Sequence, residues 1–446
     1  MATATQIFLS PDHAGIARVS ECPVGAIEAA NHLLQTNHDE HHMFWRPVAG
    51  HNHLTHSVLT ILALGGGPAE LQRAFDDARD IQRPIPPVDR QVVEQLGDPE
   101  QFRSRIGQLD QYSNFLAFFS QEIATKGYRA VVDEHCFSGS RNAETLFAQL
   151  YEGLYHPVIH LAFGIEFEQP SIVAEALAQV ASHDSMGIEA FLMDCEAEAT
   201  QSAHSGRTLV QLFRDAEADE ALRHAAEGFD DGPARVRDGV LGRTARAITA
   251  LAAQFRVDPQ DIEHRLAEMI NCSAFITGAV QRTGKPRKID FFHLHTVTAS
   301  LSIDILVRQP WISPVVKARL VEWKARVDLV WYTATGAVQL HLPSLLNYMP
   351  TSSAGMDWAA LYRAVAAVHD DGHLAKLVRA LKSGEAVSNP FEKGAGETFP
   401  IQGIAWLKLA QMAYDTTVDR PIEQKWIWGI GFDENWTHVL SLESEK

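Results

Sequence analysis

Cysteine is scarce in this sequence, with 4 among 446 residues and no pair at the CxxC spacing. This scarcity provides neither a disulfide framework nor a zinc ribbon, and it is typical of a reducing compartment. The N-terminus also lacks a basic segment followed by a long apolar stretch, so we expect no secretory signal. These features predict a cytoplasmic protein. The cysteines are Cys22, Cys136, Cys195 and Cys272.

Basic residues and long apolar runs are lacking as well. The 38 Lys and Arg residues are outnumbered by 56 Asp and Glu residues, which gives a formal net charge of −18. Nucleic acids and anionic membranes bind basic surfaces, so we expect neither as a partner. No apolar run reaches the roughly 18 residues of a transmembrane helix, so none is expected. With 46% hydrophobic and 21% charged residues, the composition predicts a globular protein with an ample core.

Familiar cofactor and catalytic motifs are also missing. Gly65-Gly66-Gly67 follows a helix-like segment and does not fit GxGxxG, so a Rossmann site has no support. The sequence contains no P-loop, no CxxCH haem attachment and no GxSxG elbow, and the Glu-x-x-His pairs of di-iron bundles are not repeated. Asn52 stands where an HExxH zinc protease needs its carboxylate base, which excludes that class.

The apolar periodicity predicts an all-α fold. Helices are expected over residues 24–34, 54–64, 101–124, 142–155, 170–181, 208–227, 241–255, 258–277, 291–307, 314–332, 358–382 and 401–414. Residues 128–132 and 426–431 are candidate strands, and loops are expected at 83–88, 284–287 and 383–400. Histidine clusters spread from residue 51 to residue 373, so one site built from them needs the whole chain. We therefore expect a single large multi-helical domain over residues 1–446, with a metal site between helices.

Histidine is abundant, with 21 residues and many tight pairs. Neutral imidazole is the commonest protein ligand for a transition metal, and a spacing of three or four residues puts two rings on one helix face. A single histidine more often caps a helix or satisfies a core hydrogen bond. Recurrence at four separate places nevertheless favours helices that converge on one buried metal. The clusters are His51/His53/His56, His156/His160, His293/His295 and His369/His373 with Lys376.

The first two clusters each offer a preferred ligand. His56 lies deeper in its predicted helix than His53, so its backbone position is better fixed. Pro157 suits the first turn of a helix, which puts His156 near the cap and His160 inside. Glu166 is a candidate acceptor that would orient a ligating imidazole, although a surface carboxylate is the commoner outcome.

Helix geometry limits which residues of the other two clusters can be ligands. His293 and His295 are two positions apart and point about 200° from each other on a helix, so only one can be a ligand. His295 leads into an apolar run, which favours it. His369, His373 and Lys376 share a helical stripe. A lysine ammonium would be repelled by a metal, so Lys376 becomes a ligand only if it is deprotonated or carboxylated by carbon dioxide, and otherwise lies on the surface.

Together these segments resemble the questin oxidase-like family, known from fungal aromatic polyketide pathways. The similarity covers most of the chain in the same order, through four motifs that are short singly and specific together. They are His51-Asn-His-Leu-Thr-His56 with the Leu64-Gly65 region, His156-Pro-Val-Ile-His-Leu-Ala-Phe-Gly-Ile-Glu-Phe167, Asp290-Phe-Phe-His-Leu-His-Thr-Val-Thr-Ala-Ser300 and Asp370-Asp-Gly-His-Leu-Ala-Lys-Leu-Val-Arg-Ala-Leu381.

The resemblance implies an all-α oxygenase that uses dioxygen to cleave a ring of an anthraquinone, its hydroquinone or a related aromatic polyketide, with a Baeyer–Villiger-type or dioxygenase outcome. It also implies a non-haem iron(II) held by histidines and a carboxylated lysine. Carried over by motif, the metal-binding and catalytic residues are His56, His160, His295, His373 and Lys376. This sequence departs in having His293, His369 and Ser57, which leaves the ligand within each pair open. The need for NADPH and the oligomeric state stay open too.

Two other classes compete with this interpretation. His369-Asp370 after an earlier histidine is typical of an α-helical His-Asp phosphohydrolase, but that family tends to carry basic residues for phosphate and needs fewer histidines. A metal-free helical binding protein is the other. The aromatic residues Phe115, Phe118, Phe119, Trp331 and Tyr332 fit a flat apolar substrate pocket and core packing equally well.

Overall fold

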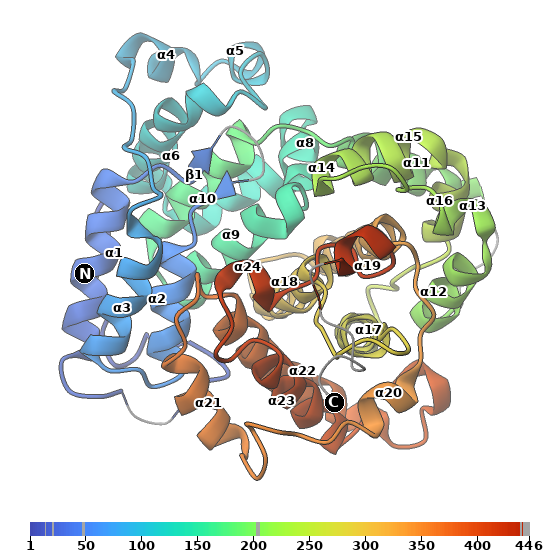
Figure 1. The fold of residues 1–446 in the computed structure, drawn as a ribbon. Coiled ribbons are helices and arrows are strands. Elements are labelled where there is room, and N and C mark those ends of the chain that lie inside the picture. The colour runs from blue at the N-terminus through green and yellow to red at the C-terminus, as the bar shows by residue number, and fades with distance from the viewer. Residues whose placement is uncertain (14, 20–21, 47–49, 202–205, 438, 440–446) are drawn as a thin grey trace. The chain divides into compact units, whose positions relative to one another are not determined.

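Helices make up most of the chain in the computed structural model, which describes residues 1–13, 15–19, 22–46, 50–201, 206–437 and 439 (Figure 1). The prediction of a mostly helical protein is confirmed. A small antiparallel hairpin was not expected: β1 (Phe44–Arg46) pairs with β2 (Gly50–His51), and Phe44 lies opposite His51. None of the described helices is both long and apolar enough to cross a bilayer.

The chain divides into two compact units. Unit 1 comprises Met1–Glu189, Ile305–Ser313 and Tyr362–Arg379, and unit 2 comprises Ala190–Asp304, Pro314–Leu361 and Ala380–Lys446. The single domain over residues 1–446 stays a prediction.

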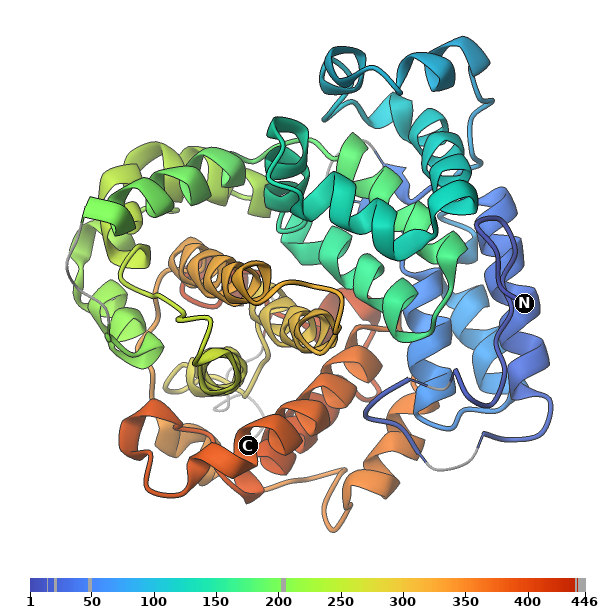
Figure 2. The same ribbon diagram turned by 180° about the vertical axis from the view of Figure 1, so that it is seen from behind.

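Unit 1 is built around α2 and α10, two helices that are buried on every side. All ten residues of α2 and every residue of α10 after Pro170 are buried, the pattern of a helix in a core. Helix α2 packs on α1, α3 and α9, while α10 packs on α6 and α9. The blue helices α1, α2 and α3 lie side by side in both views (Figures 1 and 2). The bounds are α1 (Ala26–Glu40), α2 (Leu54–Ala63), α3 (Pro68–Arg79), α4 (Arg90–Gln95), α5 (Pro99–Arg103), α6 (Tyr112–Lys126), α7 (Tyr128–Val132), η2 (Asp133–Phe137), α8 (Arg141–Gln149), α9 (His156–Glu166) and α10 (Pro170–Ser182).

Unit 2 centres on α17 and α19, which pack on each other. Their long buried stretches enclose an ion pair between Lys324 and Asp328, 2.5 Å from Nζ to Oδ2, and Ser273 bonds the same carboxylate. The main helices of this unit are α11 (Ile188–Gln201), α12 (Leu209–Ala218), α16 (Ala245–Ala252), α17 (Ile262–Ala279), α18 (Phe291–Val307), α19 (Pro314–Ala334), α20 (Leu342–Leu346) and α23 (Ile404–Asp415).

Both strand predictions were wrong. Residues 128–132 form helix α7, whose apolar side packs on α6 and α10. Within 426–431 only Ile427 makes a bridge, to Asp290. Alternation over five or six residues does not distinguish a strand from a short buried helix, and tertiary packing decided here.

Two predicted helices are interrupted. The one over 101–124 divides into α5 and α6, with Gly107 at φ +80° between them. The one over 358–382 divides into α21 (Trp358–Ala366) and α22 (His373–Glu392), with Gly372 at φ +89° before α22. Since α22 runs on to Glu392, most of the loop expected at 383–400 is helix instead. Phe115 and Phe119 of α6 are fully buried and stack at 6.2 Å between ring centroids, so core packing accounts for them.

Candidate metal centre

Seven histidines of unit 1 form one group, here called the histidine cluster: His51, His53, His56, His156, His160, His183 and His373. They come from β2, the start of α2, the start of α9, the end of α10 and the start of α22. Six are buried and His53 is nearly so, with 11% of its side chain exposed. Buried imidazoles that converge from several elements are an arrangement that can hold a transition metal.

Asn52 fixes the start of α2 beside the cluster. Its Oδ1 accepts a hydrogen bond from the backbone N–H of Leu54, while its Nδ2 donates to Asn37 Oδ1 at 2.8 Å. These bonds hold the residues around it, His51, His53 and His56, in register with α1. Asn52 therefore positions histidines instead of acting as a catalytic base.

A strained turn positions His156. Leu154 and Tyr155 have φ of +58° and +66°, which is uncommon for residues with side chains, and Gly153 precedes them at φ +51°. His156 Nδ1 lies 2.6 Å from Gly153 O and donates to it. A Cβ at Gly153 would lie 2.0 Å from His183 Nε2, so only glycine fits where the turn meets the cluster.

Asp371 orients two of the rings. Its Oδ1 lies 2.5 Å from His373 Nδ1 and its Oδ2 lies 3.3 Å from His53 Nδ1. Burial raises the pKa of this carboxyl, but the charges and hydrogen bonds of His373 and His53 hold the pKa well below its usual range. The ionised carboxylate accepts from both Nδ1–H groups, which leaves the Nε2 of each ring with a lone pair.

Three imidazole nitrogens then converge. One nitrogen each from His53, His156 and His373 lies within 4.8 Å of the others, and His53 Nε2 is 2.7 Å from His156 Nε2. Because His156 Nδ1 donates to Gly153 O, its Nε2 also carries a lone pair. A protonated His53 could donate to both Asp371 and His156. Burial and the Lys376 charge lower the pKa of His53 to about 3, however, which disfavours the protonated form near neutral pH. A cation bound by both lone pairs would remove this conflict.

Asp370 has a different task. Its carboxylate accepts from the backbone N–H groups of His373 at 2.7 Å and Leu374 at 3.1 Å, so it caps α22. The cap sets the first residue of the helix, His373, against the cluster. Gly372 allows this approach, because a Cβ there would lie 2.2 Å from Ser57 Oγ.

A second chain of polar contacts runs through Glu175 of α10. Its two oxygens accept from His38 Nδ1 at 2.6 Å and His160 Nε2 at 2.8 Å. Burial raises the pKa of Glu175, but these hydrogen bonds prevail and lower it to about 2. His160 Nδ1 is therefore an acceptor and takes the Nε2–H of His56 at 2.9 Å. His56 Nδ1 is left buried with no hydrogen-bond partner among the described residues.

The family of the chain follows from comparison with known proteins. The questin oxidase-like family model matches residues 50–381, which carry the whole histidine cluster. The chain belongs to the questin oxidase-like family. It is 60% identical to a questin oxidase of Aspergillus fumigatus over 448 residues, which cover 99% of this chain and 100% of that protein. It is 56% identical to the Baeyer-Villiger oxidase ptaJ of Pestalotiopsis fici over 441 residues, 99% of each chain.

A third relative agrees with these two. The Baeyer-Villiger monooxygenase dmxR6 of a Cryptosporiopsis species is 46% identical over 438 residues, which cover 97% of this chain and 98% of that protein. The resemblance read from the four motifs is thereby confirmed, and the chain is an oxidoreductase. This class is neither the phosphohydrolase nor the binding protein considered above.

Unit 1 brings together four of the five residues carried over from the family. His56 and His160 share a hydrogen bond, and His373 packs at 4.8 Å, centroid to centroid, against His53. Lys376 is buried at 4% exposure, so it does not lie on the surface. Burial lowers the pKa of Lys376 to about 8, although the charges of Asp371 and Asp370 oppose this.

The fifth residue, His295, belongs to unit 2. It is buried on α18, and its Nδ1 donates to Phe291 O at 2.7 Å. His293 is buried too, with Nε2 2.8 Å from Thr335 Oγ1. The two rings thus have separate neighbours, as positions two apart on a helix require.

Two sequence interpretations need correction. His369 does not share a stripe with His373 and Lys376, because α22 begins at His373; its side chain is 74% exposed and pairs with Asp77. Glu166 does not orient an imidazole, because Arg379 and the Ile16 N–H occupy it. Glu175 orients an imidazole instead, that of His160. It was not among the predicted residues, although it is the only acidic residue in the apolar run 170–182 and could have been recognised by that.

The donor set fits a non-haem transition metal. Imidazole nitrogens suit iron, zinc and copper alike, and each of the three converging rings has its Nδ1 held by Asp371 or Gly153. Such outer acceptors fix the tautomer and orientation of ligating histidines in metalloproteins.

Proposed function

We propose that this protein is a Baeyer–Villiger-type oxygenase that opens a ring of an anthraquinone, or of its hydroquinone, with dioxygen and a non-haem iron(II) in the histidine cluster. The relatives named questin oxidase and Baeyer-Villiger oxidase support the reaction type. The observation that carries the metal is the pair of Nε2 atoms of His53 and His156, which face each other at 2.7 Å inside a buried group.

Two ligand sets compete, and only the first lies wholly within the histidine cluster of unit 1. The contacts favour His53, His156 and His373, because their Nδ1 atoms are all committed to acceptors. The family resemblance instead implies His56, His160, His295, His373 and Lys376. His373 is common to both sets. We propose the first set as the ligands, with His56 and His160 as the neighbouring pair that Glu175 orients.

Lys376 would add an anionic oxygen to this site. Its buried amine has a pKa of about 8, so about a tenth is neutral at pH 7 and able to attack carbon dioxide, far more than for an ordinary lysine. The ammonium first loses one proton. The nitrogen lone pair of the neutral amine then forms a bond to the carbon of carbon dioxide and a second proton is released, so that a carbamate replaces the cation. This exchange also removes the positive charge that lowers the pKa of His53 and His56.

When bound, the iron would supply the one-electron chemistry that dioxygen needs before it reacts with a closed-shell aromatic substrate. The chain's own residues have separate tasks. Asp371 and Gly153 hold the tautomers of the three rings, and Glu175 holds that of His160. Burial of the cluster excludes bulk water, which protects reactive oxygen species from side reactions.

Metal analysis combined with oxygen uptake tests this function. Protein purified under anaerobic conditions is loaded with iron(II) and offered anthraquinones and their reduced forms, with and without NADPH. We expect oxygen uptake that matches formation of a ring-opened product and that disappears after chelation. Full turnover by protein shown to be free of metal would overturn the metal, and no product from any anthraquinone or hydroquinone would overturn the substrate class.

A further inference from the structure

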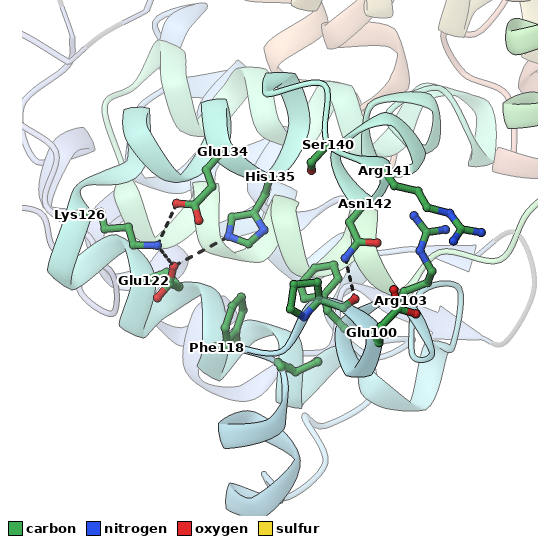
Figure 3. Close-up of a pocket in the computed structure, with 14 residues that line it drawn as sticks. Glu100, Arg103, Phe118, Glu122, Lys126, Glu134, His135, Ser140, Arg141 and Asn142 are labelled. Carbon is green, nitrogen blue, oxygen red and sulfur yellow. Dashed lines mark hydrogen bonds and ion pairs between the residues drawn. The ribbon is translucent and has the colours of Figure 1, made fainter.

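A pocket of unit 1 holds a second group of potential metal ligands, built from elements outside the histidine cluster. The pocket has a volume of about 360 Å³ and is lined by α5, α6, η2 and the start of α8. One ligand atom each from Glu122, Glu134 and His135 lies within 4.8 Å of the others. Figure 3 shows the two carboxylates and the imidazole pointing toward one another across this pocket.

A π-helix presents two of these side chains. Helix η2 (Asp133–Phe137) has the wider turn of a π-helix, a local feature that concentrates at functional sites. It brings Glu134 and His135, which are neighbours in sequence, to the side that faces Glu122 of α6 (Figure 3). Such a local distortion is maintained only where the surrounding packing compensates for it.

His135 is held in place with a nitrogen unused. Phe102, Phe118 and Phe119 surround its ring at centroid distances of 5.6, 5.8 and 5.2 Å. Its Nε2 lies 3.9 Å from Glu122 Oε2, too far for a hydrogen bond, and finds no hydrogen-bond partner within the described part of the chain. The imidazole is therefore fixed beside two carboxylates, and its buried Nε2 makes no hydrogen bond. This nitrogen is available to bind a metal ion.

Lys126 supplies the present counter-charge. Its Nζ bonds Glu122 and lies 2.9 Å from Glu134 Oε2, between the two carboxylates (Figure 3). The side chain is 37% exposed and is the last residue of α6, so it can turn into solvent without disturbing the helix. The ammonium thus keeps the carboxylates close together and neutralised until another cation takes its place.

We propose that Glu122, Glu134 and His135 bind a divalent transition-metal ion in exchange for the Lys126 ammonium, and that the metal ties α6 to η2. Two carboxylates and one imidazole are a ligand set that suits Zn²⁺, and the pocket leaves room for water to complete the coordination. This site is independent of the proposed oxygenase function.

Zinc titration of chelator-treated protein against a chromophoric competitor tests the site. We expect Glu134→Gln and His135→Phe to bind one equivalent less than wild type, since phenylalanine suits the aromatic surroundings and keeps the fold. Glu100→Gln, which changes a carboxylate in the same pocket that is not a ligand, keeps the full number. Lys126→Met is expected to bind zinc about fivefold tighter, because the competing charge is gone.

Equal zinc binding by wild type, Glu134→Gln and His135→Phe would overturn the site, as would loss of zinc in Lys126→Met. A purely structural ion-pair network predicts equal zinc binding by all of these proteins, with lower stability in Lys126→Met and no gain in affinity. The His53→Ala variant separates the two proposals. It lacks one of the three converging nitrogens of the histidine cluster and is expected to keep the equivalent bound at His135.

Discussion

His53 Nε2 lies 2.7 Å from His156 Nε2 within a buried cluster, and the Nδ1 atoms of both rings donate elsewhere. Two lone pairs at this distance repel unless they share a proton or bind the same cation. Burial and Lys376 lower the pKa of His53 to about 3, so the proton is disfavoured near neutral pH. This relationship supports the proposed metal site and leads to the first prediction.

His53→Ala and His156→Ala are each expected to bind less than about a tenth of the wild-type iron, because each removes one of three converging nitrogens. Metal content of the purified, iron-loaded variants measures this, with circular dichroism as a check on folding. His224→Ala, which changes an exposed histidine paired with Glu227, is the matched control. If His56→Ala and His160→Ala lose iron while these two variants keep it, the ligand set implied by the family resemblance is the right one.

Asp371→Asn should weaken iron binding by about 10- to 100-fold, the usual effect of losing an acceptor behind ligating histidines. The amide keeps the size of the side chain but can accept from only one of His53 and His373. Competition with a chelator gives the affinity. Asp80→Asn, at a side chain that is 89% exposed, should leave it unchanged. Unaltered affinity in Asp371→Asn would show that the carboxylate does not orient the ligands.

Glu175→Gln is expected to destabilise the fold by about 3 kcal/mol at pH 7, since it leaves two buried imidazoles without their ionised partner. The pKa of Glu175 is depressed from 4.5 to about 2, so its contribution is complete above about pH 4.5 and disappears as pH falls toward 2. Urea unfolding across this range measures the effect. The difference in stability between wild type and Glu175→Gln should shrink as the solution is acidified through that window, and a constant difference would contradict the assignment.

The sequence predicts the elements that carry the cluster better than the contacts within it. The periodicity of α2 and α10 predicts these helices to within a residue or two, because their apolar runs are long. The break before α22 was missed, since Asp370 and Gly372 read as ordinary positions in a continuing helix. That break removes His369 from the site and turns Asp370 into a cap.

Long-range polar pairing accounts for the rest of what was missed. Asp371 contacts His53, which lies more than 300 positions away in the sequence. His183, at the end of α10, lies 2.9 Å from His51, measured between the two Nε2 atoms. Helical spacing relates only residues within a turn or two, so it cannot show such partners. The preference for His56 over His53 rested on depth within the helix and stays a prediction, while the acceptor that His53 shares with His373 supports the ligand set proposed above.

Gly153→Ala should destabilise the protein by about 2–4 kcal/mol, because it combines a left-handed backbone with a direct clash. The added Cβ would lie 2.0 Å from His183 Nε2 and 2.7 Å from His51 Nε2. Gly127 provides the control, with φ +79° and no atom of the described chain within 4 Å of an added Cβ. Gly127→Ala therefore reports backbone strain without a clash, about 1–3 kcal/mol, since its ψ of +149° puts it in a region that is nearly restricted to glycine. Equal losses of stability for the two variants would show that the histidine cluster rearranges to accommodate the added methyl group.

Lys376→Ala is expected to lose at least about 100-fold in activity if the carbamate is a ligand, because the site then lacks its anionic oxygen. Lys382→Ala is the control, since Lys382 pairs with Glu385 on the same helix and is 38% exposed. Acetate or formate should restore part of the activity of Lys376→Ala by filling the vacated space, and should leave Lys382→Ala unchanged. Protein prepared with ¹³C-labelled carbon dioxide should give a carbamate signal that Lys376→Ala lacks. Wild-type activity without that signal would show that the buried amine acts only through its charge, and Lys376→Met would then raise the pKa of His53 toward its ordinary value.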